Sequence, residues 1–257
     1  MKRLENRVAF VPGASSGIGR SIARAFAAEG ARLVLSARRA DRLREVAAEL
    51  EAEHGARIHS GPLDVRRRAD VEAFVSRIPA EWKEVDLLVN NAGLSRGLDK
   101  VHEGNADDWD EMIDTNVKGL LYVSRAVLPG MVERNRGHVV NIGSIAGREL
   151  YPGGSVYCAT KFAERAITKG MLIDLNGTDI RVTTIDPGLV RTEFSIVRFH
   201  GDAARAAKVY QGTEPLTPDD IAEAVLFAVT RPAHMNIAEM VILATCQAGA
   251  AMVSRKA

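Results

Sequence analysis

The stretch HVVNIGSIAGRELYPGGSVYCATK, which runs from His138 to Lys161, decides how the rest of the chain is interpreted. Its mostly apolar run 139–142 predicts a buried strand with Ser144 at its end, and its last residues begin a helical pattern that carries Tyr157 and Lys161. Residues four apart on a helix share one face, with Cβ atoms roughly 5–6 Å apart. Because an ammonium beside a phenol favours the phenolate, this pair can act as an acid or base near neutral pH.

The pair alone permits a second interpretation, since tyrosine and lysine at this spacing are also common on solvated helices. Ser144 favours the chemical interpretation, because its hydroxyl could hydrogen-bond the oxygen that Tyr157 protonates. Cys158 is expected to be a small packing residue, since nothing near it in the sequence favours a thiolate.

The composition is ordinary for a soluble globular protein. The chain has 257 residues, of which 46% are apolar and 26% charged, so it can bury a sizeable core. A formal net charge of +1 gives no general attraction to nucleic acid or to an anionic membrane. We therefore expect a small-molecule substrate rather than either of those partners.

Targeting signals and metal-ligand patterns are also missing from the sequence. The first residues, MKRLENR, lack the apolar segment of a signal peptide, and no run approaches the roughly 18 apolar residues of a membrane span. Two cysteines, Cys158 and Cys246, suit a reducing compartment. The six histidines show no ligand spacing. The sequence predicts a cytoplasmic protein with no metal site.

A glycine-rich segment lies between a first predicted strand, 7–11, and a helical pattern over 20–29. Strand, glycine loop and helix in this order present backbone N–H groups and a positive helix end to a pyrophosphate. The spacing G-x-x-x-G-x-G differs from the G-x-G-x-x-G fingerprint, and any tight turn can use glycine. The loop residues expected to bind a dinucleotide are Gly13, Ser15, Ser16, Gly17, Ile18 and Gly19.

The second predicted strand, 32–36, is followed by Arg38 and Arg39. In a dinucleotide-binding fold an acid at this strand end bonds the 2′-hydroxyl of NAD, whereas arginine accommodates the 2′-phosphate of NADP. No acid is present, so the sequence predicts NADP. Alternatively, the two arginines belong only to the surface of the helix expected over 41–54.

Two further predicted strands, 57–63 and 85–89, end in polar residues. Asp64, which precedes Val65, could accept the adenine amino group or cap the following helix. After the second of these strands, two amides and a glycine could let a ligand approach the backbone closely, although they also fit a simple turn. The residues expected near the cofactor here are Asp64, Val65, Asn91, Ala92 and Gly93.

The second half of the chain continues the alternation of helix and strand. Asn105 resembles the N-cap of a helix that continues to about 130, with Asn116 in its middle. Asparagine is a poor helix former, so Asn116 either faces solvent or perturbs the helix. A helix over 156–176 and a strand over 180–185 follow, and Asp186-Pro187-Gly188 ends that strand.

The segment 189–212 has weak periodicity and holds Arg191, Thr192 and Arg198, so we expect a lid or a substrate loop. Thr217 begins a helix with a capping pattern, and 240–244 supplies a last strand. The alternation predicts one α/β domain over 1–257, with a doubly wound parallel sheet of about seven strands and helices on both faces.

These residues in this order resemble the short-chain dehydrogenase/reductase family over essentially the whole chain. The resemblance implies a Rossmann-type sheet and hydride transfer between a nicotinamide and a carbonyl or alcohol carbon. It also implies that Tyr157 is the general acid or base, that Lys161 bonds the nicotinamide ribose and that Ser144 orients the substrate oxygen. The backbone carbonyl of Asn116 would hold a water at a local break in its helix.

The resemblance implies further cofactor contacts and an assembly. The contacts carried over are Tyr157, Lys161, Pro187, Gly188, Val190 and Thr192. The assembly is a homotetramer or homodimer built partly on the helices of Asn116 and Tyr157. One departure is Pro12, where the family usually has a threonine that ties the glycine loop to the Asn-Asn-Ala-Gly turn. Proline lacks both the hydroxyl and the N–H, which puts cofactor affinity in doubt.

The runs YPGGSVYCATK and PGLVRTEFSIVRFHGD resemble a bacterial, NADP-dependent branch that acts on 3-hydroxy acids such as serine, allo-threonine or 3-hydroxypropionate. A carboxylate substrate needs a cation, and arginine can bind it with two hydrogen bonds. The residues expected at the substrate are Ser144, Arg148, Tyr151 and Arg191, although both arginines could instead be surface residues. The alternatives are a broader ketone or aldehyde reductase and a non-catalytic NADP-binding sensor.

Overall fold

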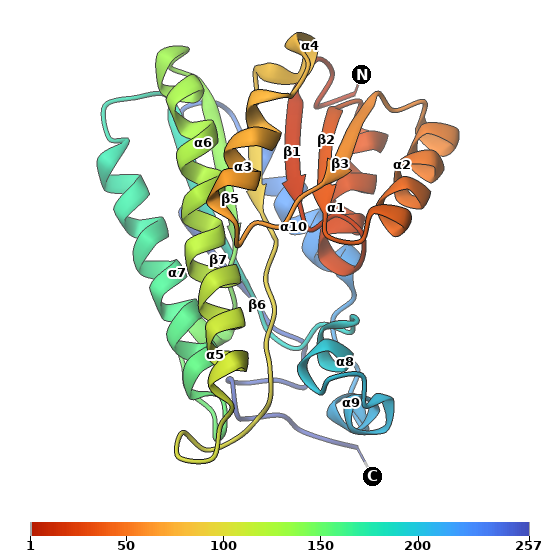
Figure 1. Cartoon of the computed structure of the whole chain (residues 1–257), viewed down its shortest axis with the longest axis vertical. Helices are drawn as coiled ribbons and strands as arrows, with labels where there is room; N and C mark the ends of the chain where they lie inside the picture. The colour runs from red at the N-terminus through yellow and green to blue at the C-terminus, as the bar shows by residue number, and fades with distance from the viewer. Residues whose placement is uncertain (1, 257) are drawn as a thin grey trace.

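A computed structural model describes residues 2–256 of the chain. In this part of the chain seven parallel strands form one sheet, in the order β3-β2-β1-β4-β5-β6-β7 (Figure 1). The strands are β1 (Val8–Pro12), β2 (Arg32–Ala37), β3 (Ile58–Pro62), β4 (Leu87–Asn90), β5 (Gly137–Ile142), β6 (Ile180–Pro187) and β7 (Glu239–Ile242). The strand order reverses between β1 and β4, and ligands of open α/β sheets bind at such a reversal.

Helices cover both faces of the sheet, because successive strand residues point to opposite faces. Ala9 and Val11 of β1 pack in one core, against α1 (Gly17–Ala28), α2 (Ala40–His54) and α10 (Pro218–Val229). Val8 and Phe10 pack in the other core, against α3 (Arg68–Ser76), α6 (Leu120–Glu133) and α7 (Ser155–Asp174). The predicted doubly wound parallel sheet is confirmed.

The helix predicted from Asn105 to about 130 has a local break. It begins as predicted, since the Asn105 side chain accepts a hydrogen bond from the N–H of Asp107, and continues as α5 (Ala106–Ile113). A π-helical turn, η1 (Asp114–Gly119), then precedes α6. Such single-turn bulges insert an extra residue into a helix and are frequent at functional sites.

Short elements complete the structure at both ends of the strands. The segment predicted as a lid or substrate loop folds into α8 (Phe194–Arg198) and α9 (Ala203–Tyr210), which lie below the sheet in Figure 1. A 3₁₀ turn, η2 (Ile145–Gly147), follows β5, and α4 (Ala80–Lys83) precedes β4. Within residues 2–256 no helix is both long enough and apolar enough to span a bilayer.

Candidate active site

A cavity of about 990 Å³ lies at the carboxyl ends of the central strands, between the glycine loop and α8. The sequence-predicted cofactor and catalytic residues that line it are Gly13, Ser15, Ser16, Gly17, Ile18, Arg38, Arg39, Asp64, Val65, Asn91, Ala92, Gly93, Ser144, Tyr157, Lys161, Pro187, Gly188, Val190 and Thr192. The structure therefore brings together residues that are far apart in the sequence. Gly19 does not line the cavity itself but lies behind the glycine loop.

The glycine loop is fixed by Asn91. The amide of Asn91 donates hydrogen bonds of 3.1 Å to the carbonyl oxygens of Pro12 and Gly13. A Cβ on Gly19 would lie 2.5 Å from the Gly13 carbonyl oxygen, so only glycine fits at that position. Because Asn91 uses backbone carbonyls, the loop remains tied to the Asn-Asn-Ala-Gly turn even though Pro12 lacks a hydroxyl.

The first turn of α1 offers free donors to the cavity. Ser16 occupies the N-cap position, but its side chain makes no capping hydrogen bond to the helix. The first N–H groups of a helix have no partner within the helix, so they attract an anion. Together with Gly13 and Gly17, which have φ values of 79° and 54°, this loop has the form of a phosphate cradle.

The arginines that follow β2 are paired with carboxylates from distant parts of the chain. Arg39 donates to Glu193 at 2.7 Å and to the Ser16 hydroxyl at 2.6 Å, and it holds the pKa of Glu193 below its ordinary value. Arg38 lies 3.1 Å from Glu111. Both guanidinium groups are about half exposed at the cavity, so an incoming phosphate can reach them.

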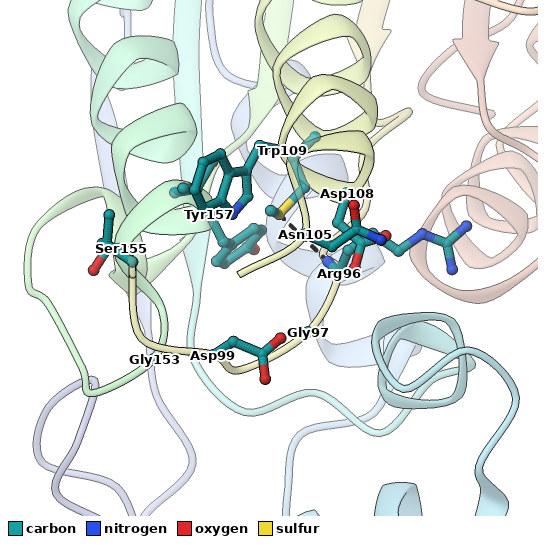
Figure 2. Close-up of a pocket in the computed structure, with 12 residues that line it drawn as sticks. Arg96, Gly97, Asp99, Asn105, Asp108, Trp109, Gly153, Ser155 and Tyr157 are labelled. Atoms are coloured by element: carbon teal, nitrogen blue, oxygen red, sulfur yellow. Dashed lines mark hydrogen bonds between the residues drawn. The ribbon is translucent and has the colours of Figure 1, made fainter. Parts of the chain in front are cut away.

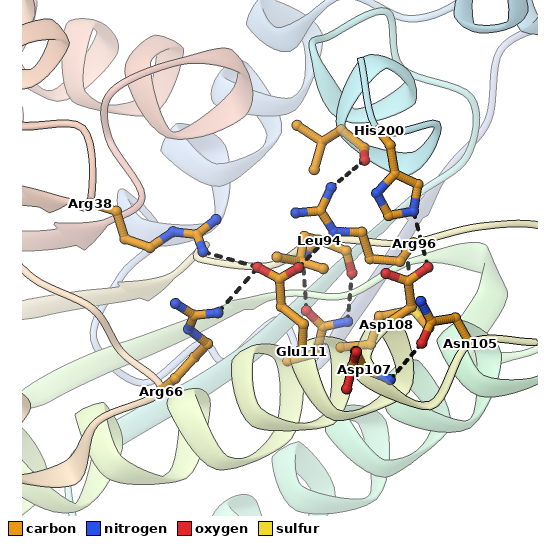
Figure 3. A network of polar contacts seen from close by, with 12 residues as sticks. Arg38, Arg66, Leu94, Arg96, Asn105, Asp107, Asp108, Glu111 and His200 are labelled. Atoms are coloured by element: carbon orange, nitrogen blue, oxygen red, sulfur yellow. Dashed lines mark hydrogen bonds and ion pairs between the residues drawn. The ribbon is translucent and has the colours of Figure 1, made fainter. Parts of the chain in front are cut away.

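Glu111 of α5 joins three arginines (Figure 3), two of which, Arg38 and Arg96, line the cavity. Its carboxylate accepts hydrogen bonds from Arg38, Arg66 and Arg96, with the Arg96 bond at 2.6 Å. Burial alone would raise the pKa of Glu111, but Arg96 and Arg38 together hold it below the ordinary value. Arg66 also pairs with Asp64 at 2.5 Å, and the Arg66 N–H donates to the same carboxylate at 3.1 Å. Since Arg67 occupies the N-cap position of α3, Asp64 does not cap that helix.

The predicted pair of α7 lies in the cavity wall. Tyr157 and Lys161 are both buried, and the ring of Phe194 meets the ring of Tyr157 edge-on at 5.5 Å. The Lys161 Nζ donates to the Ile142 carbonyl at 2.9 Å and to Glu164 at 2.7 Å. The Ser144 Oγ accepts a hydrogen bond from the Ala146 N–H at 3.1 Å, so its own O–H remains available to a ligand.

Asn116 lies in the π-helical turn and is 2% exposed, which excludes the solvent-facing interpretation. Its side chain bonds both backbone groups of Leu94, at 2.9 and 2.8 Å, and the hydroxyl of Thr160 at 3.0 Å. The residue therefore joins the β4 turn to α7 at the level of the tyrosine. It does not line the cavity with its side chain.

Arg148, expected at the substrate, lies elsewhere. Its guanidinium donates to the buried Asp186 at 2.7 Å and also pairs with Glu239. It does not line the cavity. Two carboxylates on β6 and β7 therefore determine where this arginine points, and its role here is structural.

Arg191 is also outside the cavity lining, with its guanidinium 5.5 Å above the ring of Tyr210. The cation that does line the cavity at the tyrosine is Arg198 of α8. Its Cζ lies 5.4 Å from the ring centre of Tyr157 and 4.9 Å from that of Phe194. Within residues 2–256 no carboxylate pairs with Arg198, unlike Arg148.

Tyr151 completes this end of the cavity. Its hydroxyl accepts a hydrogen bond of 2.9 Å from Arg198, which also donates to Ser95 at 3.1 Å. Burial raises the pKa of Tyr151, so it stays a neutral phenol. Burial likewise raises the pKa of the fully buried Cys158, in agreement with its predicted packing role.

Tyr157 also borders a second, small hollow beside Trp109 and Arg96 (Figure 2). Its volume of about 20 Å³ is enough for about one water molecule. A substrate must therefore approach Tyr157 from the large cavity. In the described residues no group of three or more His, Cys, Asp or Glu side chains is arranged to hold a metal ion.

Known proteins resemble this chain closely. The NADP-dependent 3-hydroxy acid dehydrogenase YdfG of Salmonella typhi is 51% identical over 231 residues, which is 90% of this chain and 92% of that protein. The NADP-dependent 3-hydroxy acid dehydrogenase of Schizosaccharomyces pombe is 46% identical over all of this chain and 99% of its own length.

A solved structure and a family match agree with this. The closed form of a serine dehydrogenase complexed with NADP⁺ superposes with a TM-score of 0.91 at 47% identity, covering 97% of this chain and all of that one. The sequence model of the short chain dehydrogenases matches residues 7–202. The chain therefore belongs to the short-chain dehydrogenase family.

Proposed function

We propose that this chain is an NADP-dependent oxidoreductase that transfers hydride between the nicotinamide and a small 3-hydroxy acid, or its carbonyl form. The observation that carries the proposal is Arg198, a cation without a carboxylate partner that stands over the Tyr157 ring at the wall of the cavity. The names of the relatives, which act on 3-hydroxy acids and serine with NADP, agree with it.

The cofactor end of the cavity fits NADP in three respects. The uncapped first turn of α1 and the glycine cradle suit the pyrophosphate, and Arg38 and Arg39 suit the 2′-phosphate. A bound nicotinamide would accept or return the hydride. Asp64 and Val65 line the cavity beyond the arginines, where the resemblance puts the adenine.

The protein's own groups handle the proton and the orientation of the substrate. In oxidation Tyr157 takes the proton of the substrate hydroxyl, and in reduction it returns a proton to the carbonyl oxygen. Ser144 donates its O–H to the same oxygen and so fixes it next to the phenol. Lys161 has three N–H donors, of which Ile142 and Glu164 use two, so one remains for a ribose hydroxyl.

Arg198 replaces Arg148 and Arg191 as the proposed carboxylate ligand. Its guanidinium donates hydrogen bonds to Tyr151 and Ser95, and these two bonds fix its position. Three aromatic rings lie within about 6 Å of its Cζ and the side chain is half-buried, so its remaining N–H groups face the cavity, where they can bind a carboxylate. A substrate bound there has its hydroxyl beside Tyr157.

The test is a set of steady-state rates with the full-length protein and NADP. Serine and 3-hydroxypropionate should be oxidised much faster than 1-propanol, and NAD should be a poor replacement for NADP. Equal rates on the uncharged alcohol would indicate the broader alcohol, ketone and aldehyde specificity instead. Binding of NADPH without turnover of any of these substrates would indicate the non-catalytic sensor.

We also propose that residues 1–257 act as one domain that assembles into a homotetramer or homodimer in the cytoplasm. The support for assembly is a set of exposed apolar side chains on α6 and α7. They are Leu121, Val132, Phe162 and Ile173. Light scattering behind a sizing column would decide, because a monomer at micromolar concentration would contradict the assembly. Replacing Phe162 and Ile173 by Ser should lower the mass to that of a smaller species.

A further inference from the structure

Helix α7 carries a third ionisable side chain beside the proposed catalytic pair. Glu164 lies three residues after Lys161, and its Oε2 accepts a hydrogen bond of 2.7 Å from the Lys161 Nζ. Glu164 is 3% exposed and Lys161 is 7% exposed, so water hardly reaches either group. The roles proposed above for Tyr157 and Ser144 do not use this carboxylate.

The position is an unfavourable one for a carboxylate. A buried charge is costly unless it is paired and its remaining lone pairs are satisfied. Lys161 satisfies one oxygen of Glu164, but the other, Oε1, is buried and has no hydrogen-bond partner among the described residues. Ionisable groups held in such surroundings are more frequent at functional sites than in structural cores.

The charged groups that act on Glu164 come from two elements. Lys161 precedes it on α7, and the buried Asp186 faces it from β6, with Arg148 bound to Asp186. Burial raises the pKa of Glu164, and Asp186 adds to this effect while Lys161 opposes it. Burial by itself would lower the pKa of Lys161, but Glu164 and Tyr157 outweigh burial, so the lysine stays cationic.

We propose that Glu164 is a positioning residue of the reaction, which fixes the Lys161 ammonium at the end of β5 and partly neutralises its charge next to Tyr157. This inference rests on the proposed function in one respect, the roles of Tyr157 and Lys161. Two acceptors, the Ile142 carbonyl and the Glu164 carboxylate, then determine where the ammonium lies.

Glu164 should also affect the pH dependence of the reaction. The negative charge of Glu164 should oppose the formation of a phenolate at Tyr157, whereas the Lys161 ammonium should favour it. Loss of the anion should therefore allow oxidation at lower pH. Glu164 lies seven residues after Tyr157 on α7, which is about 10 Å along the helix axis. At an effective dielectric constant of about 20, a unit charge about 10 Å away displaces a titration by about one pH unit.

The experiment compares Glu164→Gln, Glu164→Asp and Glu164→Leu in NADP-dependent oxidation over a range of pH. The Gln variant keeps an acceptor but loses the charge, so its pH for half-maximal kcat/KM should fall by about one unit, with a plateau kcat within about threefold. The Asp variant keeps the charge and should retain the wild-type midpoint. The Leu variant loses the acceptor too, so its plateau kcat should fall about tenfold besides the shift.

A matched control is Asp174→Asn, which removes an exposed carboxylate from the same helix and should leave the profile unchanged. A Glu164→Gln profile that superposes on that of the wild type would overturn the inference. If Glu164→Gln does not fold, Glu164→Leu must show the same shift of midpoint, and its absence counts equally against the inference.

Failure of the proposed function can be recognised separately. If the wild type oxidises no hydroxy acid, the comparison is made on the phenolate absorbance that Tyr157→Phe removes, measured against pH in the absence of substrate. A lower midpoint of that absorbance in Glu164→Gln supports the inference whatever the substrate is. An equal midpoint overturns it.

Discussion

The two ends of the cavity were encoded in the sequence in different ways. At the cofactor end, short motifs at strand ends carry the site, and nearly every residue that they predicted lines the cavity. At the substrate end, neither of the two predicted arginines does so, and Arg198 stands there instead. The backbone of a short motif sets the positions of its own residues. The direction of a long side chain depends instead on hydrogen-bond partners that lie far away in the sequence.

The largest effect on activity is expected at Tyr157, where the cofactor end and the substrate end of the cavity meet. Tyr157→Phe should lower kcat by about 10²–10⁴-fold, because the proton has no acceptor, while the Kd for NADPH stays within a few-fold. Stopped-flow turnover and fluorescence titration of NADPH measure the two quantities. Tyr122→Phe, in α6 and outside the cavity lining, is the matched control, and an equal loss in it would contradict the assignment.

A second test disrupts only the cofactor end of the cavity, at the glycine loop. Gly19→Ala puts a Cβ 2.5 Å from the Gly13 carbonyl oxygen, so the loop must shift. The Kd for NADPH should rise about 10–100-fold and the free energy of unfolding should fall by about 1–3 kcal/mol. Gly170→Ala, in α7 with no atom within 4 Å of the new Cβ, should instead stabilise by about 0.5–1 kcal/mol. Fluorescence titration of NADPH and urea unfolding measure the two quantities in both variants. An unchanged Kd for NADPH in Gly19→Ala would contradict the role of the glycine loop in cofactor binding.

A third test separates the 2′-phosphate from the rest of the cofactor. Arg38→Ala should weaken NADP about tenfold more than NAD, because only NADP loses a charge-assisted hydrogen bond. Calorimetric titration of both cofactors measures this difference. A similar loss for NAD and NADP would mean that Arg38 does not read the 2′-phosphate.

The smallest effect on activity is expected at Arg148. Arg148→Met leaves the buried Asp186 without its partner, so the free energy of unfolding should fall by about 1–3 kcal/mol. The preference for a carboxylate substrate should not change, because Arg148 does not line the cavity. Urea unfolding and the rates on charged and uncharged alcohols check the two parts. A loss of carboxylate preference here would restore the sequence-based expectation.

The parts of the structure that depend on local sequence pattern could be predicted from the sequence. The sheet, the glycine loop and the Tyr157–Lys161 pair depend on local pattern and spacing, so the sequence contained them. Asn116 was recognisable as a misfit in its helix, and the π-helical turn explains it. The doubt about Pro12 was not resolvable, because the tie from Asn91 to the Pro12 carbonyl exists only once β1 and β4 are adjacent.

The residues that sequence reasoning missed depend on packing. Arg198 was noted only as part of a segment without clear periodicity, and its position comes from the way α8 packs on Tyr157 and Phe194. Glu164 had one available signal, a carboxylate three residues after Lys161 on a helix. That signal fits a surface ion pair equally well, and only the burial of both groups distinguishes them.

The most direct measurement of the account is the ratio of kcat/KM for 3-hydroxypropionate to kcat/KM for 1-propanol in Arg198→Met, beside Arg148→Met and Arg191→Met. If Arg198 binds the substrate carboxylate, its variant should lower this ratio about 10–100-fold, the value of one hydrogen-bonded charge pair, while the other two variants keep the wild-type ratio. An unchanged ratio in Arg198→Met, or an equal fall in either control, would contradict the account.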